Sequence, residues 1–300
     1  MFDTLSLFLF LSITLCSLFF LRSSVGVPYG LYHLTLNKEL GDSDSSPKTE
    51  WMNQGYWKAT TSFPEACRAL ALKLLKAAKY KVGDSVLDVG HGTGESLIMF
   101  LTDRDIPRPS KLVGITNAPS QYQRSKERVS RVRSSNDEAA KVSVDLYCGD
   151  AICRDAAPPT HPLHVQNTAR FDVVFALDCA YHFATRKEFL AQAYQKLAPG
   201  GRIVLGDICF AKEFPSRVIA FIATKIMPKE NIVSPQEYIQ LLEKLEYTEV
   251  ELEDITSDSF VGLCKFLSTR GALWYIYSCF LSWFQDAGGA RFVVVTARKP

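Results

Sequence analysis

One stretch constrains the fold of this 300-residue chain more than any other: VLDVGHGTGES, residues 86–96. An apolar run carries Asp88 near its end, and glycines then alternate at Gly90, Gly92 and Gly94. Glycine has no Cβ, so it can adopt positive φ and let backbone amides approach a bound molecule. The N-terminus of a following helix adds a positive potential. The pattern predicts a ligand-binding turn between a strand and a helix; a tight turn that needs glycine for geometry alone is the alternative.

Apolar, strand-like runs alternate with amphipathic helical stretches along the rest of the chain. Such alternation predicts an α/β fold in which a mostly parallel sheet is covered by helices on both faces. One domain is enough for this length, because single cores stop growing at roughly 250 to 300 residues. The strand-like runs are residues 85–89, 111–115, 142–147, 171–177, 202–207, 248–255 and 291–297.

Charge and cysteine content exclude several function classes. The formal net charge is only +2, which is too balanced for a nucleic-acid-binding protein. The eight cysteines are scattered and include no C-x-x-C pair, so we expect neither a disulfide scaffold nor a zinc site. The sequence therefore predicts no metal and no nucleic-acid partner.

The N-terminal segment predicts a membrane anchor. Residues 4–21 contain no charged side chain, and 18 residues of helix span roughly 27 Å of hydrocarbon. A cleavable signal peptide is the alternative, since residues 24–26 offer a small-x-small site, but no Lys or Arg precedes the apolar run. The prediction is a hydrophobic anchor helix within residues 1–24.

The residues that flank the apolar run predict the orientation of the anchor, and the residues after it predict a linker. Asp3 precedes the apolar run and Arg22 follows it, which predicts a single-pass protein of an endomembrane with its domain facing the cytosol. Residues 25–50 contain the polar stretch GDSDSSPKT and predict a linker. The domain itself is then residues 51–300.

The spacing of the glycines separates two ligand classes. Dinucleotide-binding proteins use G-x-G-x-x-G, whereas this loop reads D-x-G-x-G-x-G and resembles that of class I S-adenosylmethionine-dependent methyltransferases. The resemblance implies S-adenosylmethionine as cofactor and a Rossmann-like, doubly wound, mostly parallel seven-stranded sheet. It also implies that Gly90, Gly92 and Gly94 approach the cofactor while Asp88 orients the loop or binds the ammonium group through water. For Asp88, a strand-end acid that caps loop amides is the alternative.

Two more segments extend the resemblance. NQGYW, residues 53–57, is similar to an N-L-G-Y-W segment that folds over the cofactor, which implies that role for Tyr56 and Trp57; core packing is the alternative. GITNAPSQ, residues 114–121, is similar to the G-I-T-x-S-x-x-Q segment of the cyclopropane-synthase, tocopherol and natural-product sugar methyltransferase group, to which sterol methyltransferases also belong. That likeness implies cofactor contacts from Ile115, Thr116 and Gln121.

The adenine end is assigned by the same resemblance. YCGDA, residues 147–151, resembles the segment whose acid receives the adenine amino group, which implies that role for Asp150. An acid after glycine is also a common turn residue, and this is the alternative. Ala151 and Leu177 complete the expected cofactor-binding set.

The candidate base lies beyond the fourth strand-like run, in ALDCAYHFATR, residues 176–186. His182 has an ordinary pKa of about 6.5 and can accept a proton near neutrality. The segment resembles A-L-E-S-x-x-H-x-x-D of sugar and natural-product O-methyltransferases, and LGDI, residues 205–208, resembles their strand-end acid. The resemblance implies that Asp207 orients or charge-balances His182. The alternatives are a structural hydrogen bond for His182 and helix capping for Asp207. We expect His161 and His164, in a Pro-rich loop, to be solvated.

The sequence thus predicts a membrane-tethered methyltransferase for a small or lipophilic acceptor. Transfer to oxygen is favoured, because His182 supplies a base. An apolar insertion at residues 210–233 is expected to cover the substrate pocket. Carbon methylation of a sterol-like or isoprenoid lipid, a non-catalytic scaffold and an NAD-dependent oxidoreductase remain as alternatives.

Overall fold

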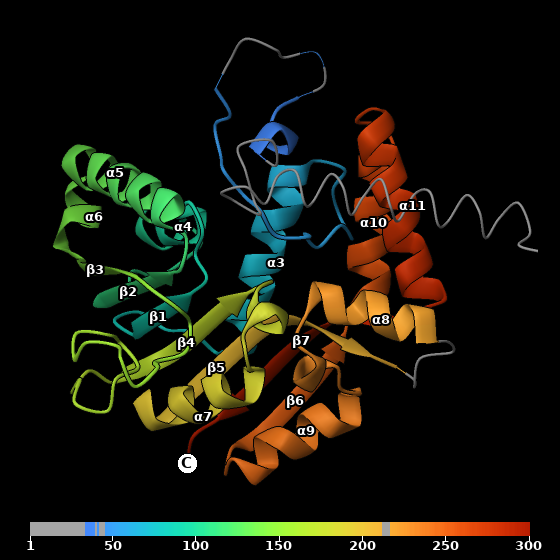
Figure 1. The fold of residues 1–300 in the computed structure, drawn as a ribbon. Helices are drawn as coiled ribbons and strands as arrows, with labels where there is room; N and C mark the ends of the chain where they lie inside the picture. Colours follow the sequence, from blue (N-terminus) through green and yellow to red (C-terminus); the bar gives the residue numbers. More distant parts are fainter. Residues whose placement is uncertain (1–33, 40, 42–45, 212–216) are drawn as a thin grey trace, which may run out of the picture.

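Seven strands form a single sheet in the order β3-β2-β1-β4-β5-β7-β6 (Figure 1). A computed structural model of the chain describes residues 34–39, 41, 46–211 and 217–300. The strands β1 to β5 pair in parallel, whereas β7 is antiparallel to both β5 and β6. The strands are β1 Ser85–Val89, β2 Lys111–Thr116, β3 Ser143–Cys148, β4 Phe171–Leu177, β5 Leu197–Phe210, β6 Thr248–Asp254 and β7 Ala290–Arg298.

The predicted seven-stranded, Rossmann-like sheet is confirmed. Each predicted run overlaps an observed strand, and four of the strand starts agree to the residue. The largest difference is β5, which extends to Phe210 because β7 pairs with it antiparallel from Arg202 to that residue. An antiparallel partner of this length is a tertiary feature and leaves no local pattern in the sequence.

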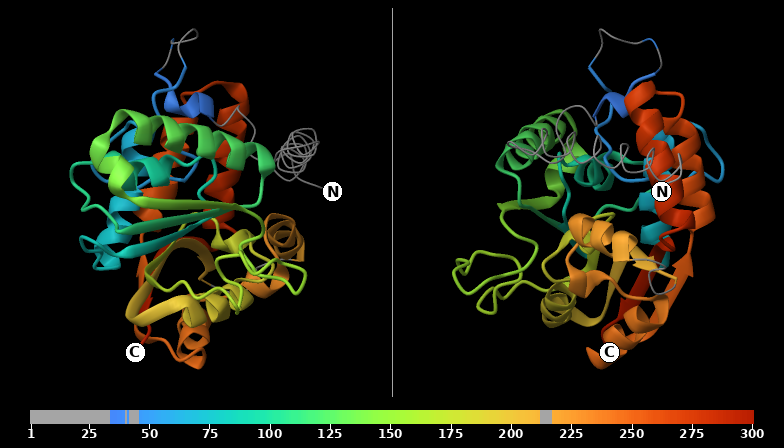
Figure 2. Two further views of the ribbon diagram at one scale, coloured as in Figure 1. Left: turned by 90° about the vertical axis from the view of Figure 1, so that its left-hand side faces the viewer. Right: turned by 45° about the vertical axis from the view of Figure 1, so that its right-hand side comes forward.

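Helices cover both faces of the sheet (Figures 1 and 2), and the sheet between them divides the core in two. Neighbouring residues of β1 show the division, because Val86 belongs to one apolar cluster and Leu87 to the other. The first cluster contains residues of α3, α4, α10 and α11, and the second contains residues of α7 and α9. The helices are α3 Phe63–Ala77, α4 Glu95–Thr102, α5 Pro119–Ser135, α6 Asp137–Lys141, α7 Arg186–Lys196, α8 Arg217–Ile226, α9 Pro235–Lys244, α10 Thr256–Leu267 and α11 Ala272–Asp286, with 3-10 helices η1 Thr35–Asn37, η2 Ala180–His182 and η3 Lys229–Asn231.

The predicted single-pass membrane localisation is contradicted. None of the helices in the described part of the chain combines the length and apolar character needed to cross a bilayer. The apolar helix α11 is 15 residues long, about 22 Å, and its Trp274, Leu281 and Phe284 are buried in the core. The anchor expected at residues 1–24, with its apolar run 4–21, lies outside the described residues.

The predicted linker, residues 25–50, contacts the domain at its described end. Asn37 is buried and exchanges two hydrogen bonds with the backbone of Trp51, at 2.9 and 3.0 Å. Glu50 receives two hydrogen bonds of 2.7 Å from the guanidinium of Arg124. The division at residue 51 stays a prediction, but these contacts tie Asn37 and Glu50 to the sheet-bearing unit.

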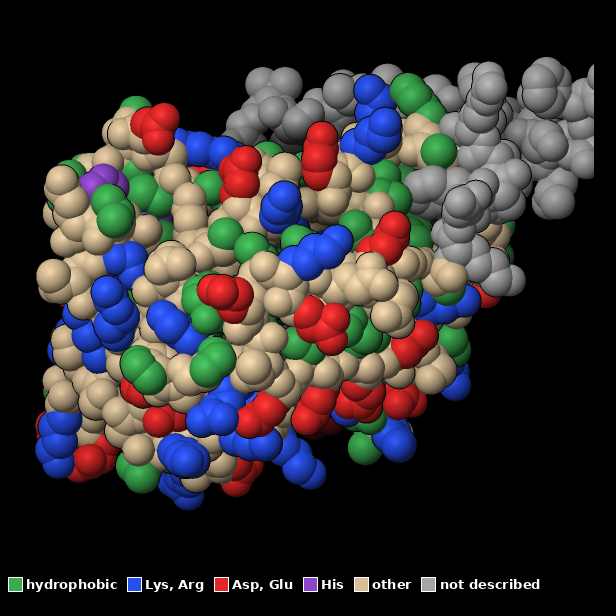
Figure 3. All heavy atoms as spheres, turned by 90° about the horizontal axis from the view of Figure 1, so that it is seen from below, with side chains coloured by type: hydrophobic (Ala, Val, Ile, Leu, Met, Phe, Trp, Pro, Cys, Tyr) green, Lys and Arg blue, Asp and Glu red, His purple; other side chains and the backbone are tan. Residues whose placement is uncertain are grey.

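Charged side chains of both signs are interspersed on the face seen in Figure 3. Elsewhere in the described part of the chain, surface charges form ion pairs, such as Lys73 with Glu253 and Arg298 with Glu249. The face in Figure 3 therefore lacks the strongly positive surface that a polyanionic partner would need.

Candidate active site

Four adjacent parallel strands end along one edge of the sheet, in the order β3, β2, β1 and β4. Val89 pairs with Ile115, and Ile115 pairs with Tyr147, so the ends of β1, β2 and β3 are level. In open α/β sheets, ligands bind outside the carboxyl ends of the strands. The topology therefore brings the glycine loop, Ile115 and Thr116, Asp150 and Ala151, and Leu177 to one place, although their ligand roles stay predictions.

The loop after β1 has the backbone that its glycines predicted. The φ angles of Gly90, Gly92 and Gly94 are 82°, 55° and 88°, all in the left-handed region. A Cβ added at Gly90 would lie 2.6 Å from Cys179 Sγ, and one at Gly92 would lie 2.2 Å from Met52 Cε. Backbone and neighbours thus both select glycine here, and α4 begins directly after the loop.

Buried polar atoms without a partner surround this loop. Asp88 Oδ2 accepts a hydrogen bond of 2.5 Å from Ser96, but Oδ1 has no partner among the described residues. Burial raises the pKa of Asp88 to about 7. Gln54 Oε1 and His91 Nε2 are likewise buried and unpartnered in this part of the chain. We call the glycine loop and these buried atoms the cofactor cradle. Because unpartnered buried groups cost free energy, the cradle fits a ligand that brings hydrogen-bond donors, as the ammonium end of S-adenosylmethionine does.

The segment of residues 50–54 lies across the glycine loop. Thr93 Oγ1 donates to the Glu50 carbonyl at 3.2 Å, and the Glu50 amide donates to Glu95 at 2.7 Å. The Gln54 amide donates to Asp178 Oδ2 at 2.7 Å, just beyond the end of β4. Met52, Gln54 and Asp178 were not predicted as site residues. Gln54 and Asp178 lie inside the matched segments 53–57 and 176–186, and Met52 directly precedes the first of them.

Tyr56 and Trp57 pack outward from this segment. Trp57 is buried, and its ring lies 5.2 Å from that of Phe266 of α10. The Tyr56 ring has Lys73 Nζ of α3 at 5.0 Å. These contacts support the core alternative for both rings, and their role over the cofactor stays a prediction.

The residues predicted to bind the cofactor around its adenine end lie at or after the ends of β2 and β3. Thr116 Oγ1 donates to Gln121 Oε1 at 3.4 Å, and the Gly149 amide donates to the Thr116 carbonyl at 2.9 Å. Asp150 is exposed, and its Oδ1 accepts the Ile152 amide at 3.0 Å. Asp150 is therefore oriented at the strand end, with its other carboxylate oxygen available for a ligand.

His182 lies in η2, the short helix after β4. Its Nδ1 is 2.9 Å from the carbonyl oxygen of Ile226, the last residue of α8. Asn231, buried in η3, donates to the carbonyls of Tyr181 and Phe183 at 2.9 and 2.6 Å and accepts the Arg186 amide at 2.8 Å. Ile226 and Asn231, both near the C-terminal end of the predicted insertion, thus bind the turn that carries His182. The role of Asn231 was not foreseen.

Asp207 has partners other than the predicted one. Its fully buried carboxylate lies 2.9 Å from Arg186 Nε and accepts hydrogen bonds from Tyr238 Oη at 2.7 Å and from the Ile208 amide at 2.9 Å. The charge-balancing role predicted for Asp207 is therefore corrected: the cation beside it is Arg186, and this pair joins β5 to α7.

Asp178 is an acid that the sequence analysis did not foresee. It follows β4 with φ of +58°, an uncommon backbone for a residue other than glycine. Desolvation raises the pKa of its carboxyl to about 8. The next residue, Cys179, reaches the glycine loop by donating to the Val89 carbonyl at 3.1 Å.

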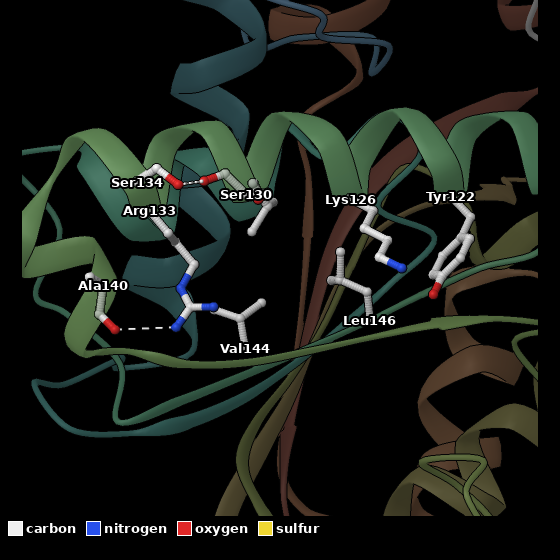
Figure 4. A pocket seen from close by; sticks show the side chains of 9 residues that line it. Tyr122, Lys126, Ser130, Arg133, Ser134, Ala140, Val144 and Leu146 are labelled. Atoms are coloured by element: carbon white, nitrogen blue, oxygen red, sulfur yellow. Dashed lines mark hydrogen bonds between the residues drawn. The ribbon is translucent and has the colours of Figure 1, made fainter.

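A cavity of about 430 Å³ lies elsewhere, between α5, α6 and β3 (Figure 4). Lys126 and Arg133 line it above the apolar Val144 and Leu146. Arg133 already donates to the Ala140 carbonyl, as Figure 4 shows. None of the predicted site residues lines this cavity, so it is separate from the cofactor cradle.

The fold and the cradle together define a class I S-adenosylmethionine-dependent methyltransferase. The chain belongs to the methyltransferase-domain family, whose model matches residues 59–252. This membership excludes the oxidoreductase alternative and makes the chain an S-adenosylmethionine-dependent enzyme of the small-molecule type.

Two curated relatives act on natural products by name. The chain is 27% identical to erythromycin 3''-O-methyltransferase of Saccharopolyspora erythraea over 224 residues, which are 71% of this chain and 67% of that enzyme. It is 32% identical to 27-O-demethylrifamycin SV methyltransferase of Amycolatopsis mediterranei over 162 residues, 53% of this chain and 51% of that enzyme. The second match thus spans about half of the relative.

A solved structure shows the same fold. Geranyl diphosphate C-methyltransferase from Streptomyces coelicolor, in complex with S-adenosyl-L-homocysteine, superposes with a TM-score of 0.62 over 90% of this chain and 95% of that one. The two sequences are 17% identical, so the likeness concerns the fold alone.

Replacing Gly92 with valine should abolish S-adenosylmethionine binding while the domain stays folded, because a β-branched side chain is strained at this φ and fills the cradle. Calorimetric titration measures the loss. Gly83→Val is the matched control, since Gly83 has φ of +81° and open space around a Cβ. Equal affinity in the two variants would show that the cofactor does not approach Gly92.

Replacing Asp207 with asparagine should lower the free energy of unfolding by about 3 to 5 kcal/mol, because it leaves the buried Arg186 without its counter-charge. Urea denaturation tests this. Asp145→Asn removes the partner of Lys111 in an exposed pair and should change stability little. If the stability were unchanged and the pH–rate profile shifted, the result would instead support the predicted role of Asp207 as the partner of His182.

Proposed function

We propose that this methyltransferase transfers its methyl group to a hydroxyl oxygen of a small, lipophilic acceptor, with His182 as general base. The two relatives named above support oxygen as the acceptor atom. Apolar residues in and after α8 support a lipophilic acceptor, since Ile219, Ile222 and Met227 bring buried hydrophobic surface next to the turn of His182.

The contact between His182 and α8 carries the proposal. A carbonyl oxygen only accepts, so the Nδ1 atom that faces Ile226 must carry the imidazole hydrogen. In the neutral ring the lone pair is then on Nε2, which becomes the proton acceptor. Desolvation lowers the pKa of His182, so the ring is neutral at pH 7 and ready to accept a proton.

The division of work follows from this geometry. S-adenosylmethionine, when bound, supplies an activated methyl group on a positively charged sulfur. The chain holds the acceptor in line, excludes water with α8, and takes the hydroxyl proton on His182 Nε2. Asn231 keeps the turn of His182 and the segment after α8 in one arrangement.

Carbon methylation is the second candidate, and Asp178 favours it. A methylated alkene becomes a cation that must lose a proton, and a buried carboxylate at the end of β4 could accept that proton. With a pKa of about 8, Asp178 exchanges protons near neutrality. The two candidates differ in which residue limits turnover, His182 or Asp178.

Replacing His182 with alanine should lower turnover by about 10²- to 10⁴-fold, the usual contribution of a positioned base, and leave S-adenosylmethionine affinity nearly unchanged. The lowered pKa of His182 means that the wild-type rate should rise with pH through an ionisation below about 6.5 and then level off. Methyl-labelled cofactor and mass spectrometry of the product measure the rate across pH.

His164→Ala is the control, because this histidine accepts a backbone amide within its own loop, at 3.2 Å, and should leave the profile unchanged. If His182→Ala keeps its rate over the whole pH range and Asp178→Asn loses it, proton removal from oxygen is not the reaction, and carbon transfer replaces it.

A further inference from the structure

His161 is buried where the sequence predicted a solvated residue. It lies in the Pro-rich loop between β3 and β4, and only 1% of its surface is exposed. The loop turns back on itself there, since the His161 amide donates to the Pro158 carbonyl at 2.9 Å. A buried histidine next to a ligand edge must have defined partners, because an unpaired ring nitrogen would be costly.

Both ring nitrogens of His161 have a backbone partner. Nδ1 accepts the Leu163 amide at 3.0 Å, so Nδ1 carries no hydrogen. The hydrogen of the neutral ring is therefore on Nε2, which donates to the Asp150 carbonyl at 3.0 Å. The ring also meets the Tyr147 ring edge-on, with 4.9 Å between centroids. His161 thus holds the end of β3 from outside the cofactor cradle.

Residue 150 is fixed at two points by these contacts. Its carbonyl is held by His161, and its Oδ1 is held by the Ile152 amide at 3.0 Å. Oδ2 is the oxygen left to receive a donor such as the adenine amino group. The direction of Oδ2 therefore depends on a side chain that does not itself touch the cofactor.

We propose that His161 is a positioning residue of the adenine end of the site, and that its protonation makes cofactor affinity depend on pH. The proposal rests on the role predicted for Asp150. Neutral His161 joins the Asp150 carbonyl to the Leu163 amide. Protonated His161 carries hydrogens on both nitrogens, so Nδ1–H would oppose the Leu163 N–H and the loop must open.

The charges around His161 set the direction of the effect. Burial lowers the pKa of His161 below the usual value, and the charge of His164 lowers it further. The hydrogen bond to the Asp150 carbonyl and the negative charge of Asp150 raise it. Of the other groups in reach, Tyr147 presents an aromatic edge, and Lys196 Nζ is bound to the Asn167 carbonyl of the same loop. The closed loop therefore requires neutral His161. The contribution of His161 to affinity should be constant above about pH 6.5 and fall as pH decreases. Asp88 and Asp178 titrate in the wild type and in the His161 variants alike, so the difference between these proteins isolates His161.

Calorimetric titration with S-adenosylmethionine from about pH 8 to pH 5 tests the proposal on the full chain. Wild-type affinity should fall toward acid pH, by up to about tenfold per pH unit once protonation dominates. His161→Gln places a non-titrating amide N–H near the Nε2 position and should bind within about threefold of wild type at neutral pH, without the part of the acid-pH fall that His161 causes. His164→Gln is the matched control: it should keep the acid-pH fall, moved slightly toward higher pH because His164 no longer lowers the pKa of His161.

His161→Asn separates the two bonds. Its amide oxygen takes the place of Nδ1 for the Leu163 amide, but the Asp150 carbonyl loses its donor. Affinity at neutral pH should fall about tenfold below that of His161→Gln, by the loss of one buried hydrogen bond. Equal affinity of the two variants would overturn the positioning role, and a pH profile of His161→Gln identical to that of the wild type would overturn the protonation.

The role of Asp150 is tested apart from that of His161. The wild type should bind S-adenosylmethionine more tightly than an analogue that lacks the adenine amino group. Equal wild-type affinity for the two would overturn the assignment of Asp150 while leaving the His161 profiles interpretable. Failure of the proposed oxygen transfer would appear only in turnover, which these binding measurements do not use.

Discussion

The parallel pairing of β1 with its two neighbours is the constraint on which the rest of the structure depends. The Gly90 amide donates to the Ile115 carbonyl at 2.8 Å, so the glycine loop continues the ladder between β1 and β2 by one further bond. Everything beyond this bond must fit a backbone in the left-handed region. Met52 and Cys179 approach to distances that no Cβ allows, and α4 directs its N-terminus at the same space. A shift in the strand register would displace all of these groups together.

Buried charge near the loop complements that geometry. Burial raises the pKa of the Cys179 thiol well above its usual value, and the negative charges of the acids Asp207, Asp88 and Asp178 raise it further. Only Asp207 has a cation within ion-pair distance among the described side chains, and that cation is Arg186. Two buried acids without a counter-charge are unfavourable in isolation. A cofactor with positive ammonium and sulfonium groups would favour the ionised form of these carboxyls, so their burial at this place suits the ligand that the family uses.

Most of the fold could be predicted from the sequence, and the site only in part, for one physical reason. Strands and the glycine loop are encoded locally, by apolar runs and by glycine spacing, and their predicted bounds agree closely with the structure. The partners of Asp207 and the burial of His161 depend on contacts between distant segments. Arg186 reaches Asp207 across 21 positions, and a polar, Pro-rich composition gave no indication that His161 folds back onto Asp150. Local pattern carries no information about which helix covers which strand end.

The NQGYW segment shows how residues outside the site set its geometry. Trp57 is held from α10, because its amide donates to the Asp258 carbonyl at 2.6 Å and its ring packs on Phe266. Its indole N–H then donates to the Gln54 carbonyl at 2.7 Å, and the Gln54 amide reaches Asp178. A continuous path of hydrogen bonds therefore joins α10 to the end of β4. A buried aromatic ring can thus decide where the backbone of residues 50–54 lies, so core packing and a role in the site are compatible for this residue.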